Sequence, residues 1–124
     1  MIKENYDMDE TKKERENAFI KIMYRRKIMV LDCPDIVMIR KENRITKFYT
    51  IRGIFMEYKP LIELEMLLPK YFIRCNASTI INKKYIKCYN HTELVMENGG
   101  ILKIGRSFKA GVLSSIEEDK KKKW

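Results

Sequence analysis

The sequence predicts one mainly β domain with short helices and an extra N-terminal helix. Short runs rich in Ile, Val, Tyr and Phe recur from residue 27 onward and are separated by polar turns, a pattern typical of strands. The chain has 124 residues and 45% hydrophobic composition, which is enough for one core but not for two. No internal repeat and no second apolar block is visible along the chain.

A helix is expected over about residues 12–25. Thr11 and Glu14 form a capping-box pattern, and Phe19, Ile20 and Met23 follow at helical spacing. The many charged residues predict an exposed helix with one apolar edge. We therefore expect a helical extension at residues 1–26, the main domain at residues 27–117 and a charged tail at residues 118–124.

Alternating or continuous apolar runs predict the strands of the main domain. The expected strands are residues 28–31, 36–40, 45–51, 54–58, 72–75, 85–89, 94–96 and 102–104. A hairpin tip is expected near Glu42 and Asn43, and the run Asn98-Gly99-Gly100 suits a second tight turn because its residues readily take positive φ.

Three further helical elements are expected. Prolines at positions 60 and 69 bracket a short helix. Ser78 can cap a single helical turn that runs through Asn82, because its hydroxyl can accept from a free backbone amide. Phe108, Val112 and Ile116 lie at four-residue spacing and predict a final amphipathic helix that begins near Ser107.

The positive charge is concentrated in two blocks of the chain. The formal net charge is +9. Residues 70–109 carry eight basic and two acidic side chains, and residues 40–59 carry six basic and two acidic ones. Such concentration favours a polyanionic partner, most often nucleic acid, although a solvated lysine-rich surface would look similar.

Neither catalysis nor a bound metal is expected. The single histidine, His91, lies in a predicted turn, and no cluster of groups with matched catalytic roles accompanies it. Cys88 and His91 have a spacing that could supply two zinc ligands, but a closed site needs four. The glycines lack the spacing of a phosphate-binding loop. The expected protein is not an enzyme and needs no cofactor.

The composition indicates a cytoplasmic protein. No apolar stretch approaches the length of a membrane span, and the charged N-terminus lacks the apolar region of a signal peptide. An odd number of cysteines, three, argues against a disulfide framework and fits a reducing compartment.

Polar, positively charged breaks fall at three strand ends: the hairpin near residues 41–47, the break at residues 76–78, and residues 105–107 before the last helix. Loops on a rigid β scaffold can present side chains to a groove while nearby lysines contact phosphates. Arg106 suits base reading best, since a guanidinium can bond guanine O6 and N7 together.

The stretches LLPKYFIRCNASTIINKKYI and ENGGILKIGRSFKAGV closely resemble the LytTR family, the DNA-binding domain of LytR- and AgrA-type bacterial response regulators. The resemblance covers about residues 27–116 and rests on the order and spacing of a Leu-Pro, Phe-x-Arg, Ser, Asn pattern and a later Arg. It implies an elongated β-strand fold whose loops enter successive major grooves and read a pair of direct or imperfect repeats.

The resemblance also implies site residues. Thr46, Asn76 and Arg106 would contact bases. The expected phosphate contacts are Lys41, Arg44, Lys47, Arg74, Ser78, Asn82, Lys83, Lys84, Ser107 and Lys109. This chain departs from the family pattern at Asn76, Ala77 and Gly105, so its target sequence cannot be copied from relatives; Asn76 suits adenine, whereas Ala77 offers only methyl contact.

The expected function is sequence-specific binding of double-stranded DNA by a transcription regulator. Residues 1–26 are too short for a phosphorylatable receiver, so we expect a stand-alone form controlled by other means. A homodimer on DNA and a regulatory membrane-protein partner are compatible with the resemblance. The alternative is a protein-interaction module that has lost DNA reading and binds an acidic partner through its basic face.

Overall fold

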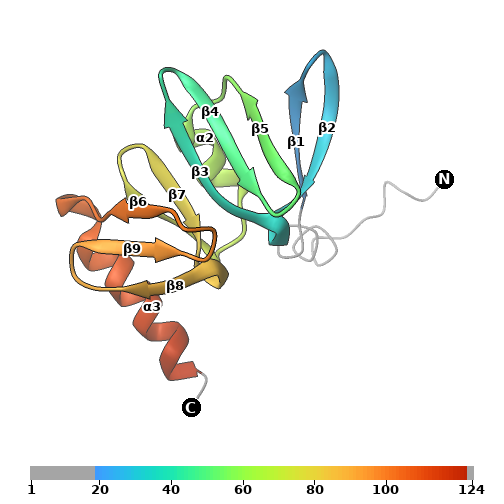
Figure 1. The fold of residues 1–124 in the computed structure, drawn as a ribbon. Coiled ribbons are helices and arrows are strands. Elements are labelled where there is room, and N and C mark those ends of the chain that lie inside the picture. The colour runs from blue at the N-terminus through green and yellow to red at the C-terminus, as the bar shows by residue number, and fades with distance from the viewer. Residues whose placement is uncertain (1–18, 123–124) are drawn as a thin grey trace.

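Three antiparallel sheets are stacked along the molecule, as the computed structural model shows for residues 19–122 (Figure 1). The first is the hairpin of β1 (Phe19–Tyr24) and β2 (Lys27–Asp32). The second has the order β5-β4-β3-β7-β6 and contains β3 (Ile36–Glu42), β4 (Ile45–Thr50), β5 (Gly53–Glu57), β6 (Phe72–Asn76) and β7 (Thr79–Asn82). The third has the order β10-β9-β8 and contains β8 (Ile86–Tyr89), β9 (Glu93–Met96) and β10 (Ile101–Lys103).

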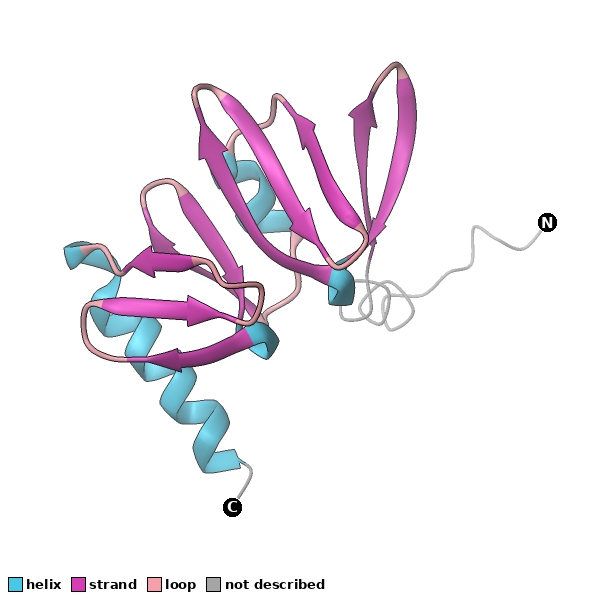
Figure 2. Cartoon of the chain, viewed as in Figure 1, coloured by secondary structure: helices cyan, strands magenta, loops and turns pink. Residues whose placement is uncertain are grey.

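Helices connect and cover these sheets (Figure 2). The short helical segments are η2 (Cys33–Asp35), α2 (Leu61–Leu67), η3 (Lys83–Tyr85) and η4 (Arg106–Phe108), and the long one is α3 (Lys109–Lys122). Pro60 is the N-cap of α2, and the helix ends at Leu67, with Leu68 as its C-cap before Pro69, as the two prolines predicted. Glu118 and the residues after it, expected as part of a charged tail, continue α3 as far as Lys122.

Strand β3 is the centre of the fold because both of its faces are buried. Ile36 and Ile39 pack into one apolar cluster, whereas Val37 and Met38 pack into the other. A β-bulge between Ile36 and Met38 lets two consecutive side chains reach the same face. The continuous apolar run of this strand is therefore the signature of a strand covered on both sides.

Each face of the five-stranded sheet has its own core. Ile20, Ile22 and Leu31 of the first hairpin and Leu61 and Leu64 of α2 cover one face. The other face packs against the three-stranded sheet and α3 through a second group of buried side chains, including Leu94, Met96, Leu102, Val112 and Ile116. Full burial of one such side chain contributes about 1.5–3 kcal/mol, so these two layers supply most of the stability.

The expectation of a helix over residues 12–25 is wrong for its described part. Residues 19–24 form β1, while residues 12–18 lie outside the described residues. Ile20 and Ile22 are buried and Phe19, Lys21 and Met23 are exposed, which is the alternation of a strand. The apolar residues also have helical spacing, but a two-residue turn and pairing with β2 favour the strand.

The single helical turn expected from Ser78 through Asn82 is also wrong. Thr79–Asn82 form β7, which pairs with β6 and with β3, and Ala77 and Ser78 form the β6–β7 turn. The four consecutive buried side chains of β7 explain the result, because a strand between two partners buries both faces. The remaining predicted strands and the final helix are confirmed with small shifts of their ends.

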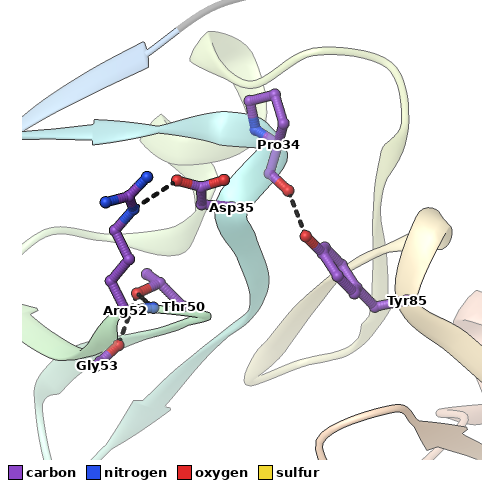
Figure 3. Close-up of polar contacts among 6 residues, drawn as sticks. All are labelled: Pro34, Asp35, Thr50, Arg52, Gly53 and Tyr85. Carbon is purple, nitrogen blue, oxygen red and sulfur yellow. Dashed lines mark hydrogen bonds and ion pairs between the residues drawn. The ribbon is translucent and has the colours of Figure 1, made fainter.

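The end of the five-stranded sheet that holds the β4–β5 turn is fixed by polar contacts (Figure 3). Arg52 pairs with Asp35 at 3.1 Å between Nε and Oδ2, and the Thr50 hydroxyl donates to the Gly53 carbonyl at 2.7 Å. The Tyr85 hydroxyl donates to the Pro34 carbonyl at 2.6 Å and so ties η3 to η2. We call this end of the sheet the closed end.

Within the described stretch of residues 19–122, no helix has the length and apolar character that crossing a bilayer requires.

Replacing Asn82 by Ala should destabilise the domain. The Asn82 side chain is fully buried, donates to the Ile36 carbonyl at 2.9 Å and accepts from the Lys84 amide at 2.9 Å. Loss of both bonds removes a partner from the buried Ile36 carbonyl and from the part-buried Lys84 amide, so urea denaturation should show a loss of about 1–3 kcal/mol in the free energy of unfolding. Asn98→Ala, in an exposed turn, is the control and should change stability much less. Equal effects would contradict a structural role for Asn82.

Candidate nucleic-acid interface

Three turns from distant parts of the sequence meet at the end of the sheet opposite the closed end. The β3–β4 turn is Asn43–Arg44, the β6–β7 turn is Ala77–Ser78, and the third segment joins β10 to η4. In Figure 1 they follow one side of the molecule. We call residues 41–47, 76–78 and 103–107 the turn edge.

Hydrogen bonds join the three turns directly. The Lys41 amide donates to the Ser78 carbonyl at 2.8 Å, which connects the first turn to the second. The Asn76 side-chain amide donates to the Lys103 carbonyl at 2.7 Å, and the Gly105 amide donates to the Cys75 carbonyl at 2.8 Å. The turns are thus parts of one bonded surface.

Arg74 holds the β6–β7 turn in shape through its guanidinium. Its Nε and Nη2 donate to the carbonyls of Asn76 and Ala77 at 3.2 and 2.7 Å. Its Nη1 pairs with Glu65 of α2 at 2.7 Å, and its guanidinium lies 5.8 Å from the centre of the Phe108 ring. With three of its five N–H groups engaged in this way, Arg74 holds the β6–β7 turn in shape.

Asn76 also maintains the turn. Its side-chain oxygen accepts from the Ser78 amide at 2.9 Å and from the Ser78 hydroxyl at 3.2 Å. A β-bulge between Arg74 and Asn76 re-aims this part of β6. A base contact by Asn76 would have to compete with three internal hydrogen bonds.

Gly105 allows the second and third turns to approach closely. A Cβ at this position would lie 3.0 Å from the Phe108 ring and 3.3 Å from the Asn76 Cβ. Both distances are tighter than ordinary van der Waals contact. The glycine that departs from the family pattern is therefore explained by the contact between these turns.

The β3–β4 turn presents cations outward. Asn43 and Arg44 both have positive φ, 50° and 72°, and both are exposed, as is Lys41. Lys47 is less available because it pairs with Glu42 at 3.1 Å. A hydrogen bond from the Tyr49 hydroxyl, and then one from Lys47, hold the pKa of the Glu42 carboxyl below its ordinary value.

The third segment carries Arg106, the one exposed residue among the three expected base readers. Arg106 and Ser107 are exposed in η4, and Lys109 is half-buried at the start of α3. Gly105 and the Asn76 contact to Lys103 fix the backbone just before Arg106. The segment therefore projects a positive charge from a backbone that is anchored to the second turn.

Four predicted site residues are either buried or far from the turn edge. Thr46 is fully buried and its hydroxyl donates to the Lys59 carbonyl at 2.5 Å, so it cannot touch a base in this structure. Asn82 is fully buried as well. Lys83 and Lys84 follow β7 at its far end from the turn edge; Lys83 donates to Ser115 at 2.8 Å and Lys84 lies over the Tyr71 ring at 5.6 Å.

Two cations of this surface were missed as individual site residues. Lys103 is exposed at the turn edge. Arg40 stands opposite Lys47 on β4 and opposite Thr79 on β7, and its Nε is buried without a hydrogen-bond partner. The only sequence signal for both was their place in the positively charged blocks.

Among the described residues, no group of three or more His, Cys, Asp or Glu side chains could hold a metal ion. His91 is exposed in the turn before β9, and Cys88 is exposed on β8. Cys33 and Cys75 are fully buried, and burial raises the pKa of their thiols to about 12 and about 11, respectively. These two thiols are core groups without nucleophilic character at neutral pH.

A β scaffold that gathers cationic turns on one side defines a class of domain suited to a polyanion. The family model for the LytTr DNA-binding domain matches residues 26–117, and the chain belongs to this family. The resemblance read from the sequence is thereby confirmed.

Relatives with known names agree with this membership. The chain is 36% identical over 96 residues to the transcriptional regulatory protein LytR of Staphylococcus aureus strains N315 and NCTC 8325, a match that covers 73% of this chain and 39% of the relative. The chain thus spans about two fifths of that protein. A solved LytTr DNA-binding domain from Bacillus cereus has the same fold, with a TM-score of 0.66, 22% identity, and coverage of 79% of this chain and 94% of that one.

The three cysteines should differ sharply in reactivity. At pH 8 Ellman's reagent should rapidly modify the exposed Cys88, whereas Cys33 and Cys75 should react only after unfolding, because they are inaccessible and their thiols stay protonated. Counting the released chromophore before and after guanidinium checks this. Cys88→Ser should abolish the rapid phase, and a second fast thiol would contradict the burial of the core cysteines.

Proposed function

We propose that this domain is a sequence-specific, double-stranded DNA-binding unit of a transcription regulator. The turn edge would enter the major groove and read bases, while cations beside it bind phosphates. Two copies would occupy a pair of direct or imperfect repeats. The proposed activity is binding without catalysis, which the membership in a DNA-binding family favours.

The observation that carries the proposal is the bonded continuity of the three turns. Each turn comes from a different hairpin or connection, yet Lys41, Asn76 and Gly105 link them through hydrogen bonds of 2.7–2.8 Å. A surface intended only for solubility would not require its charged turns to be fixed to one another. Groups fixed in place lose less conformational freedom when they bind a rigid duplex.

The roles can be divided by exposure and by bonding. Arg106 is the proposed base reader, since its guanidinium is exposed and a guanine edge accepts two hydrogen bonds from such a group. Lys41, Arg44 and Lys109 are the proposed phosphate contacts, and Ser107 can add a hydroxyl donor. Arg74, Asn76 and Ser78 would act mainly by holding the β6–β7 turn in shape.

Ala77 favours a second candidate function, a module that binds an acidic protein. At the tip of the β6–β7 turn it has no polar group that can read a base edge, and it is exposed. A module that binds an acidic protein through the same cations would tolerate alanine there. The two functions differ in one respect, because a DNA-reading domain retains weak, salt-sensitive affinity for any duplex.

Selection from a pool of random duplexes at physiological salt should yield a defined motif. If about five phosphates are neutralised, a plot of log affinity against log salt should have a slope of roughly −4 to −5, because each contact releases condensed counterions. Fluorescence anisotropy with selected and random duplexes measures both quantities. Failure to bind any duplex, together with salt-sensitive binding of a polyacidic peptide, would replace the proposal with the protein-interaction module.

Arg106→Ala should reduce affinity for the selected duplex by about 1–3 kcal/mol and relax base preference at one position, since a bidentate contact is lost. Lys41→Ala should weaken selected and random duplexes alike, because a phosphate contact carries no sequence information. Lys84→Ala removes an exposed cation away from the turn edge and is the matched control, with little effect on either duplex. Equal losses for Arg106→Ala on both duplexes would reject its base-reading role.

A further inference from the structure

A fourth cationic turn lies beyond the turn edge. Arg25 and Arg26 form the two-residue turn between β1 and β2, and Lys27 follows at the start of β2. All three residues are exposed. The sequence did not single them out, because the apolar residues before them were interpreted as one face of a helix.

Strand register places this turn at the same end of the molecule as the turn edge. The Met23 amide, next to the turn, donates to the Glu57 carboxylate at 3.0 Å, and Glu57 stands opposite Thr46 in the β4–β5 ladder. The Tyr24 ring contacts the Phe55 ring edge-on, with 5.4 Å between their centres. In Figure 1 the β1–β2 turn points the same way as the β3–β4 turn.

The charges of the fourth turn are not neutralised within the described part of the chain. No described carboxylate forms an ion pair with Arg25, Arg26 or Lys27, and Arg25 lies instead over the Tyr24 ring at 5.1 Å. At the closed end, by contrast, Arg52 pairs with Asp35. Arg25, Arg26 and Lys27 therefore remain available for an outside partner.

The backbone conformation of the fourth turn indicates that its arginines have a role in binding and not in folding. Arg25 and Arg26 have φ of 52° and 65°, the geometry of a type I′ hairpin turn. That turn favours Asn and Gly, because a Cβ is disfavoured at positive φ. Arg44 in the β3–β4 turn has the same unfavourable conformation, with φ of 72°. Strained residues of this kind cluster at binding sites.

We propose that Arg25, Arg26 and Lys27 bind the phosphate backbone of the same DNA duplex, outside the segment whose bases the turn edge reads. This inference rests on the proposed DNA-binding function. The fourth turn would lengthen the contact with the duplex and raise affinity without changing base preference, because phosphate contacts position a protein but do not read sequence.

The distance between the fourth turn and the β3–β4 turn can be estimated from strand geometry. Strands lie about 4.8 Å apart within a sheet and packed layers about 10 Å apart, so the β1–β2 and β3–β4 turns are separated by roughly 15–20 Å. At about 3.4 Å per base pair, this corresponds to about five base pairs of additional backbone contact on one flank.

The double variant Arg25→Asn with Arg26→Gly tests the proposal without disturbing the fold. Asn-Gly is the preferred type I′ pair, so the turn should be kept and the melting temperature should not fall. The matched control is Lys70→Gln with Lys84→Gln, which removes two exposed cations from the end of the sheet away from the turn edge. Both variants lower the net charge equally.

Salt-dependent anisotropy and hydroxyl-radical footprinting on the selected duplex give the readout. For Arg25→Asn with Arg26→Gly, the log–log salt slope should become shallower by about 2 and protection should shorten on one flank, while the preferred bases stay the same. The control should keep the wild-type slope and footprint. The same slope and footprint for wild type and the Arg25/Arg26 variant, or equal losses for both variants, would overturn this inference and leave the proposed function intact. Absence of duplex binding by the wild type would overturn both.

Discussion

The burial of β3 on both faces is the constraint on which the rest of the structure depends. Ile36 and Ile39 need one apolar layer and Val37 and Met38 need another, so the five-stranded sheet must lie between two covers. The first hairpin with α2 forms one cover, and the three-stranded sheet with α3 forms the other. Once both faces are occupied, polar and charged residues that must stay in water are left to the turns at the ends of the strands. The location of the charge thus follows from the layering.

Polar contacts then decide which end of the sheet can meet a partner. At the closed end, Arg52 is paired with Asp35 and Tyr85 is bonded to Pro34, so side-chain donors are used inside the molecule. At the turn edge, Arg74 takes over the internal bonding by holding the carbonyls of Asn76 and Ala77. Because the half-buried Arg74 supports the turn, the exposed cations around it need not do so. One cation fixes the shape of the turn, and the exposed cations give the surface its positive charge.

Apart from β7, the sequence could predict the strands of the main domain, because their apolar runs are bounded by clear turn residues. It could also predict the two proline-bracketed ends of α2. It could not predict β1, because Phe19, Ile20 and Met23 have helical spacing while Ile20 and Ile22 have strand spacing, and only pairing with β2 decides between the two patterns. Nor could it separate supporting from exposed polar residues. Thr46 and Asn82 look like their exposed neighbours in the chain, and their burial is set by tertiary contacts with Lys59 and Ile36.

The close approach of Gly105 to Asn76 has an evolutionary consequence. Since a side chain at 105 would push against the β6–β7 turn, the two loops can change only as a unit. Substitutions in one loop should therefore show epistasis with those in the other, because neighbouring residues that share contacts do not contribute additively. Divergence of such domains toward new targets would then proceed by compensated pairs of replacements rather than by independent single steps.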